Sequence, residues 1–109
     1  MYKIVVTNDD GIHALGIHKL VKSLEGLAEI IVVAPDTERS AEGHRITVRE
    51  GLTVKQVDFH GMNDVKAWAV NGTPADCVKM ALNVILKGRP DLVISGINAG
   101  VNLGKDIYY

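Results

Sequence analysis

The chain has 109 residues, enough for one domain, and its 12 lysines and arginines against 13 aspartates and glutamates give a formal net charge of −1. This balance, with 5% aromatic residues, argues against a nucleic-acid polymer as partner. The lone Cys77, the lack of a membrane-spanning apolar run and the absence of a visible signal peptide predict a cytoplasmic protein with no membrane partner.

Hydrophobic patterning predicts strands that alternate with helices. Apolar runs at 3–7, 28–34, 65–70 and 91–95 predict buried strands, with Pro35 stopping the second. A hairpin is expected at 46–48 and 52–57 around Glu50-Gly51, as an insertion or edge element. The polar stretch 36–45 is long for a connection, and loops of that length tend to be functional or disordered.

Two helices are expected between these strands. Apolar residues at helical spacing predict the first, which Gly26 closes: Ile17, Leu20, Val21 and Leu24. The second begins with Thr73 as its N-cap, Pro74 in the first helical position and Asp76 in the third. Gly88 and Pro90 end it, and four residues are expected on its buried face: Val78, Ala81, Leu82 and Ile85.

This alternation predicts the fold class. We expect one α/β domain over residues 1–109, a Rossmann-like three-layer arrangement with a mostly parallel sheet and a small β-hairpin insertion. The sequence stops soon after a loop rich in glycine and asparagine, so we also expect a C-terminal truncation of a longer fold.

Polar and glycine residues follow the predicted strands at one edge of the sheet, where open α/β folds bind ligands. They are Asn8, Asp9, Asp10 and Gly11 after the first strand, Ser40, Gly43 and His44 after the second, Asn71, Gly72 and Thr73 after the strand that ends at Val70, and Gly96, Asn98, Gly100 and Asn102 after the last. The sequence therefore predicts a functional site at the carboxyl ends of the strands.

Adjacent carboxylates indicate a cation at this edge. Asp9 and Asp10 are costly to hold together unless a positive charge is near, and a hydroxyl and an amide oxygen from Ser40 and Asn98 would complete a hard-oxygen ligand set. This favours Mg²⁺, Mn²⁺ or Ca²⁺. The alternative is that the two aspartates only form a turn and cap the next helix.

The residues of the last loop indicate that it binds an anion. Gly96, Gly100 and Gly104 recur every four residues and expose backbone N–H groups that can surround phosphate, although a plain connection remains the alternative. The dinucleotide fingerprint is absent, and 100–106 is not a P-loop. His44 is a candidate for binding phosphate or protonating a leaving group; the alternative is that it is an ordinary surface histidine. Cys77 is expected to pack, and Ser95 to hydrogen-bond at a strand end.

Four segments resemble the SurE family, the stationary-phase survival nucleotidases. They are V-T-N-D-D-G-I at 6–12, E-R-S-A-E-G-H at 38–44, N-G-T-P-A-D-C-V at 71–78 and S-G-I-N-A-G-V-N-L-G-K-D at 95–106. The resemblance implies a phosphatase that depends on one divalent cation and hydrolyses nucleoside 5′- and 3′-monophosphates, in some members also short polyphosphate. It also implies a homodimer or homotetramer in the full-length form.

The resemblance assigns residues by position. It implies Asp9, Asp10, Ser40 and Asn98 as metal ligands, with the two aspartates catalytic, and it places a further group around the substrate: Asn8, Gly43, His44 and Asn102. To this substrate- and phosphate-binding group we add Ser95 and Gly96, which begin the last loop. The cation is expected to polarise phosphoryl oxygens and activate water, while backbone amides of 96–104 stabilise the phosphoryl group.

Two other functions stay open. A phosphatase that forms an aspartyl-phosphate begins with a similar strand-Asp-x-Asp pattern. In the Asp-x-Asp pattern that would end at Asp10, however, Asn8 occupies the position of the nucleophile, and an amide side chain cannot act as the nucleophile. Alternatively, the chain is a non-catalytic fragment that binds metal or phosphate and lacks the C-terminal half of the family fold.

Overall fold

The structure is a computed structural model that describes residues 2–36, 46–48, 51–59, 61–86 and 88–96. In chain order the elements are β1 (Lys3–Thr7), α1 (Leu15–Leu24), β2 (Glu29–Pro35), β3 (Ile46–Val48), β4 (Leu52–Val57), β5 (Lys66–Val70), α2 (Pro74–Met80), η1 (Ala81–Ile85) and β6 (Leu92–Ser95). No helix in these ranges is both long and apolar enough to cross a membrane.

The strands form one six-stranded sheet in the order β3-β4-β5-β2-β1-β6. β5, β2, β1 and β6 run parallel, while β4 pairs antiparallel with β5, and β3 with β4. Numbered by appearance, the four parallel strands follow the order 3-2-1-4, as in one half of a dinucleotide-binding fold. The predicted mostly parallel sheet with a hairpin insertion is therefore confirmed.

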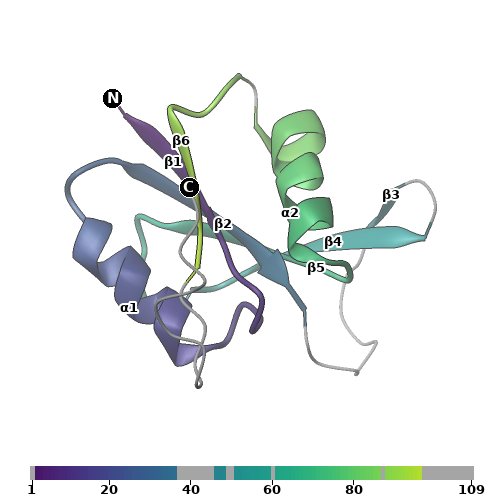
Figure 1. Ribbon diagram of the computed structural model, residues 1–109, viewed down its shortest axis with the longest axis horizontal. Helices are drawn as coiled ribbons and strands as arrows, with labels where there is room; N and C mark the ends of the chain where they lie inside the picture. Colours follow the sequence, from purple (N-terminus) through teal and green to yellow (C-terminus); the bar gives the residue numbers. More distant parts are fainter. Residues whose placement is uncertain (1, 37–45, 49–50, 60, 87, 97–109) are drawn as a thin grey trace.

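Helices cover both faces of the sheet, α1 on one side and α2 on the other (Figure 1). Alternate strand residues supply the two core layers, because side chains along a strand point to opposite faces. Val6 and Val32 pack in the layer that holds Ile17 and Val21 of α1. Val5 and Val33 pack in the layer that holds Cys77, Met80 and Ala81 of α2 and η1. The result is the expected three-layer arrangement.

The predicted start of α2 is confirmed in detail. The Thr73 hydroxyl accepts from the Asp76 backbone N–H at 3.1 Å, and the Asp76 carboxylate accepts from the Thr73 N–H at 2.9 Å. Together they form a capping box, with Pro74 in the first turn. These bonds satisfy N–H groups that would otherwise lack partners at the helix start, so the first turn is fixed locally.

The buried face expected for this helix is wrong in one position, and the helix ends before Gly88. Leu82 is 43% exposed, whereas Cys77, Met80 and Ala81 are the buried residues. The α-helix gives way at Met80 to a π-helical turn over η1, and its wider spacing changes which residues face the sheet.

Several expected strand boundaries also shift by one residue. β2 continues to Pro35, which pairs with Val70 at the strand end, because a proline in the last position still offers its carbonyl. β5 and β6 each begin one residue later than expected, at Lys66 and Leu92. The hairpin of β3 and β4 is confirmed, with Val48 opposite Leu52.

Candidate functional site at the switch between β1 and β6

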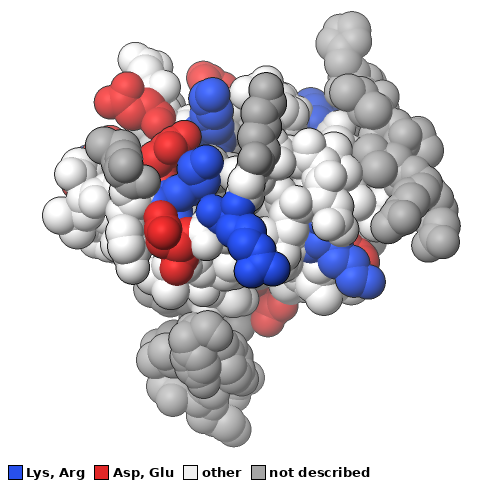
Figure 2. Space-filling view, turned by 90° about the horizontal axis from the view of Figure 1, so that it is seen from above, with Lys and Arg blue, Asp and Glu red and all other residues white. Residues whose placement is uncertain are grey.

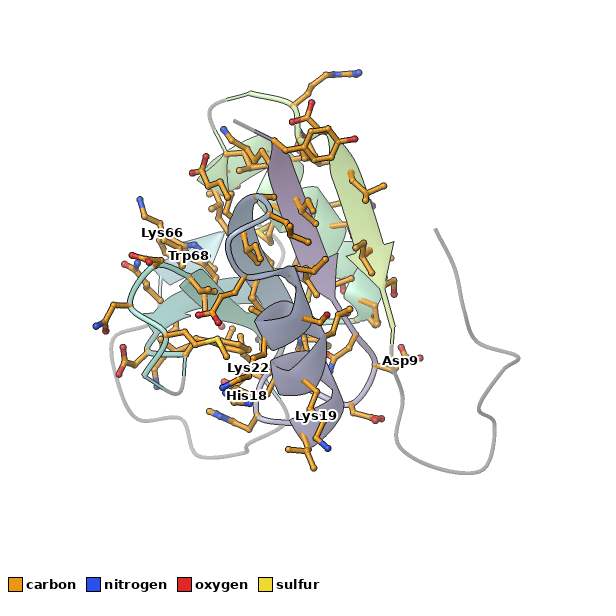
Figure 3. The ribbon with its side chains drawn as sticks, turned by 90° about the vertical axis from the view of Figure 1, so that its left-hand side faces the viewer. Asp9, His18, Lys19, Lys22, Lys66 and Trp68 are labelled. Carbon is orange, nitrogen blue, oxygen red and sulfur yellow. The ribbon has the colours of Figure 1, made fainter. Side chains whose placement is uncertain are left out.

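The carboxyl ends of β1 and β6 lie side by side. Thr7 pairs with Ser95 in the register, and the Gly96 N–H donates to the Thr7 carbonyl at 3.1 Å. The strand order reverses between these two strands, and ligands in open α/β sheets bind beyond the carboxyl ends at such a switch point. Figure 3 shows Asp9 at this edge, below the end of β6. The geometry therefore places the first predicted polar turn next to the start of the last predicted loop.

The turn after β1, which we call the β1 turn (8–11), is built around a buried amide. Asn8 is fully buried; its Nδ2 donates to the Gly11 carbonyl at 2.9 Å, and its Oδ1 accepts from the Gly11 N–H at 3.1 Å. Gly11 has a φ of +107°, a conformation that L side chains rarely adopt. In this conformation Asn8 shapes the turn, and its expected contact with phosphate stays a prediction.

The β1 turn is also tied to its neighbours. The Ala14 N–H donates to the Gly11 carbonyl at 3.1 Å, which leads the chain into α1. The Ile12 N–H donates to the Pro35 carbonyl at 2.9 Å, which joins the turn to the end of β2. The backbone on either side of the two aspartates is therefore held at both ends of the turn.

Asp9 and Asp10 occupy the middle of this fixed turn, and both are exposed. Their carboxylates are hard oxygen donors of the kind that Mg²⁺, Mn²⁺ and Ca²⁺ prefer, so the donor chemistry fits a divalent cation. Within the described ranges no group of three His, Cys, Asp or Glu residues stands close enough to hold a metal ion. The other two expected ligands, Ser40 and Asn98, lie outside the described residues.

Of the remaining predicted site residues, some are described by the structure and others are not. Ser95 and Gly96 are half-buried at the end of β6, next to the β1 turn. Gly43, His44 and Asn102 lie outside the described residues, as do the ranges 37–45 and 97–109 that contain them. The structure thus brings the two aspartates and the start of the last loop to one edge, and the rest stays a prediction.

The motif at 71–78 has a structural role that sequence reasoning recognised only in part. Asn71 follows β5, and its Oδ1 accepts from the Thr53 N–H at 2.7 Å while its Nδ2 donates to the Gly51 carbonyl at 3.2 Å. These bonds hold the hairpin against the sheet. A Cβ on Gly72 would lie 2.7 Å from the Asp76 Oδ2, so only glycine leaves room for the capping carboxylate.

The electrostatics of this helix start follow from the same contacts. The Thr73 backbone N–H, and then its hydroxyl, hydrogen-bond the Asp76 carboxylate and hold its pKa below the ordinary value. Burial raises the pKa of the Cys77 thiol to about 12. Burial outweighs the nearby Thr7 hydroxyl, which acts in the opposite direction on the pKa of the thiol but does not form a hydrogen bond in the structure. The expectation that Cys77 packs is confirmed.

Comparisons with known proteins show which sequences the chain is similar to. The sequence model of the family described as "Survival protein SurE" matches residues 4–109. The chain is 58% identical over 111 residues to a 5′-nucleotidase SurE of Brevibacillus brevis, an alignment that covers 98% of this chain and 42% of the relative. A 5′-nucleotidase SurE of Protochlamydia amoebophila is 55% identical over 107 residues, and this alignment covers 97% of this chain and 40% of the relative.

A solved structure has the same fold. The crystal structure of the SurE protein from Aquifex aeolicus superposes with a TM-score of 0.69 at 43% sequence identity, covering 95% of this chain and 40% of that one. The chain therefore spans about two fifths of the length of the relatives it matches.

Proposed function

The chain belongs to the SurE family, and from that membership we propose that it carries the metal-binding edge of a phosphomonoesterase that hydrolyses nucleoside 5′- and 3′-monophosphates. Two of the relatives described above are named 5′-nucleotidases, which supports a nucleotide as substrate. The proposal concerns one domain over residues 1–109.

One observation carries the proposal. The pairing of Thr7 with Ser95 puts the two carboxylates of the β1 turn beside the entry to the last loop, at the switch point of the parallel sheet. A phosphate ester bound there would meet carboxylate chemistry from one segment and backbone N–H donors from the other. The reaction needs this combination, because charge spreads over the phosphoryl oxygens in the transition state.

We propose Asp9, Asp10, Ser40 and Asn98 as the residues that would hold one divalent cation, with Mg²⁺, Mn²⁺ and Ca²⁺ as candidates. When bound, the ion supplies Lewis acidity toward the phosphoryl oxygens. The exposed carboxylates of Asp9 and Asp10 support this assignment, because they stand on a turn whose backbone is already fixed by Asn8 and Gly11.

The other proposed residues bind and orient the substrate. Backbone N–H groups of the loop that starts at Gly96 would donate to the phosphate, and His44, beside Gly43, would donate a proton to the leaving oxygen. Ser95 and Asn102 would add polar contacts from the same side. Asn8 holds the β1 turn in the conformation that presents both aspartates.

The direct test measures binding and turnover on the same sample. Titration calorimetry with Mn²⁺ and a nucleoside monophosphate is paired with a phosphate-release assay for the 109-residue chain, for Asp9→Asn and for Asp64→Asn. Asp64 is the matched control, because it is an exposed aspartate in the turn before β5, at the other end of the strands. We expect metal-stimulated release that Asp9→Asn abolishes and Asp64→Asn leaves intact.

A second candidate is binding without turnover. It is supported by the share of the relatives that the chain spans, about two fifths of their length. Calorimetric binding of Mn²⁺ that depends on Asp9, with no phosphate release from any nucleotide, would favour this candidate. Release of phosphate at the same rate from wild type and Asp9→Asn would reject both proposals for the site.

A further inference from the structure

A small cavity lies at the end of the sheet opposite the β1 turn, where the parallel strands begin. It has a volume of about 260 Å³, and we call it the amino-end cavity. Its walls come from the first residues of β1, β2 and β5 and from the end of η1: Lys3, Glu29, Ile31, Lys66, Trp68, Ile85 and Leu86. The proposed nucleotidase chemistry uses none of these residues.

Strand geometry explains why the charged residues gather there. Lys3, Glu29 and Lys66 each stand first in their strand, two residues before Val5, Ile31 and Trp68. Residues two apart share a face of the sheet, and the latter three pack in the layer beneath α2 and η1. The three charged side chains therefore project on the α2 side, at the rim of the gap that the end of η1 leaves.

The polar lining of the cavity has more donors than acceptors. Lys3 and Lys66 each offer an ammonium group with three donors, and Glu29 is the one carboxylate among the lining residues. The indole N–H of Trp68 is buried and meets no acceptor among the residues that the structure describes. A buried donor in a native protein is normally hydrogen-bonded, so this indole N–H is suited to an acceptor that enters the cavity.

The residues that line the cavity carry a net positive charge. Figure 2 looks down on the end of the molecule where β1 and β6 begin, and shows lysine and arginine side chains near the middle of this face with carboxylates beside them. The carboxylate of Asp91 also lies nearby, and its Oδ2 accepts from the Lys3 backbone N–H at 2.8 Å. Two lysines and one glutamate leave the lining with a net positive charge.

We propose that the amino-end cavity binds a small organic monocarboxylate with an apolar body. The carboxylate would lie between Lys3 and Lys66 and accept from the Trp68 indole, and the apolar body would contact Ile31, Ile85 and Leu86. Such a site combines an apolar lining with a few converging polar groups, as small-molecule sites do. An inorganic anion would leave the apolar wall unused, and a neutral ligand would leave the net positive charge of the lining uncompensated.

The chain offers a clean probe, because Trp68 is its only tryptophan and gives a single indole N–H signal in an NMR spectrum of the ¹⁵N-labelled protein. The probe ligand is 4-methylpentanoate, compared with its neutral amide and with inorganic phosphate. We expect a saturable downfield shift of the indole signal with the carboxylate, as hydrogen bonding to an anion requires. The amide and phosphate should each bind at least about tenfold more weakly.

Variants separate this site from general charge effects. Lys66→Gln and Lys3→Gln should each weaken carboxylate binding about tenfold. Lys19→Gln, on the exposed side of α1 (Figure 3), is the matched control and should leave it unchanged. The proposal is overturned if no saturable shift appears at millimolar carboxylate, if the amide or phosphate binds as tightly, or if Lys19→Gln weakens binding as much as Lys66→Gln.

Discussion

The side chain of Asn8 and the backbone of Gly11 bond each other twice, through Nδ2 to the Gly11 carbonyl at 2.9 Å and through the Gly11 N–H to Oδ1 at 3.1 Å. The two bonds close a ring around Asp9 and Asp10. Both aspartates are exposed while Asn8 is fully buried, so the residue before the carboxylates holds the turn that presents them.

We expect Asn8→Ala to lower the free energy of unfolding by about 1–3 kcal/mol, because it removes both bonds and leaves the buried Gly11 N–H without its acceptor. Urea denaturation at neutral pH measures the change. Asn63→Ala, at an exposed position of the turn before β5, is the control and should change the free energy by less than about 0.5 kcal/mol. Equal effects of the two substitutions would contradict the role given to Asn8.

The capping carboxylate of Asp76 should make stability depend on pH in the acid range. Its pKa is lower in the folded protein than its ordinary value of 3.8, so the unfolded chain takes up a proton more readily. The contribution of Asp76 is therefore complete above pH 3.8 and is lost as the pH falls through and below that value. Urea midpoints of wild type and Asp76→Asn should differ at pH 6, and the difference should shrink as the pH falls below 3.8. A constant difference across this range would show that the charge of Asp76 does not matter.

Cys77 should resist alkylation in the folded protein. Burial excludes reagents and raises the pKa of the thiol to about 12, so the reactive thiolate is scarce at pH 8. Iodoacetamide followed by mass spectrometry should show slow labelling in buffer and rapid labelling in denaturing urea. Rapid labelling of the native chain would mean that Cys77 of α2 does not pack against the sheet as the structure shows.

Local signals in the sequence were enough to predict the strands and the start of α2. Thr73, Pro74 and Asp76 fix the helix start through contacts within four residues, and such contacts are visible in the sequence. The end of that helix was harder to predict. The π-helical turn over η1 exposes Leu82, and a pattern that assumes regular helical spacing cannot anticipate the change.

In the candidate site, too, some features could be predicted from the sequence and others could not. Asp9 and Asp10 follow a strong strand signal, so their place at the edge of the sheet was predictable. The inward turn of Asn8 was not, because adjacent Asn and Asp side chains have similar turn preferences. The outcome depends on the left-handed backbone of Gly11 and on the bond from Ile12 to Pro35 in the next strand. The indole N–H of Trp68, which has no acceptor among the described residues, likewise owes its surroundings to packing between distant segments.

The most direct test of the metal site measures where the ion binds on the protein, instead of its effect on phosphate release. Mn²⁺ broadens the NMR signals of nearby amide protons, so substoichiometric Mn²⁺ added to the ¹⁵N-labelled chain maps where the ion binds. We predict broadening of the Gly11 and Gly96 amide signals, which flank the proposed ligands, and none at the Trp68 indole. Broadening should disappear in Asp9→Asn and persist in Asp64→Asn. Unaffected Gly11 and Gly96 signals, or broadening that Asp9→Asn does not remove, would contradict a metal site between β1 and β6.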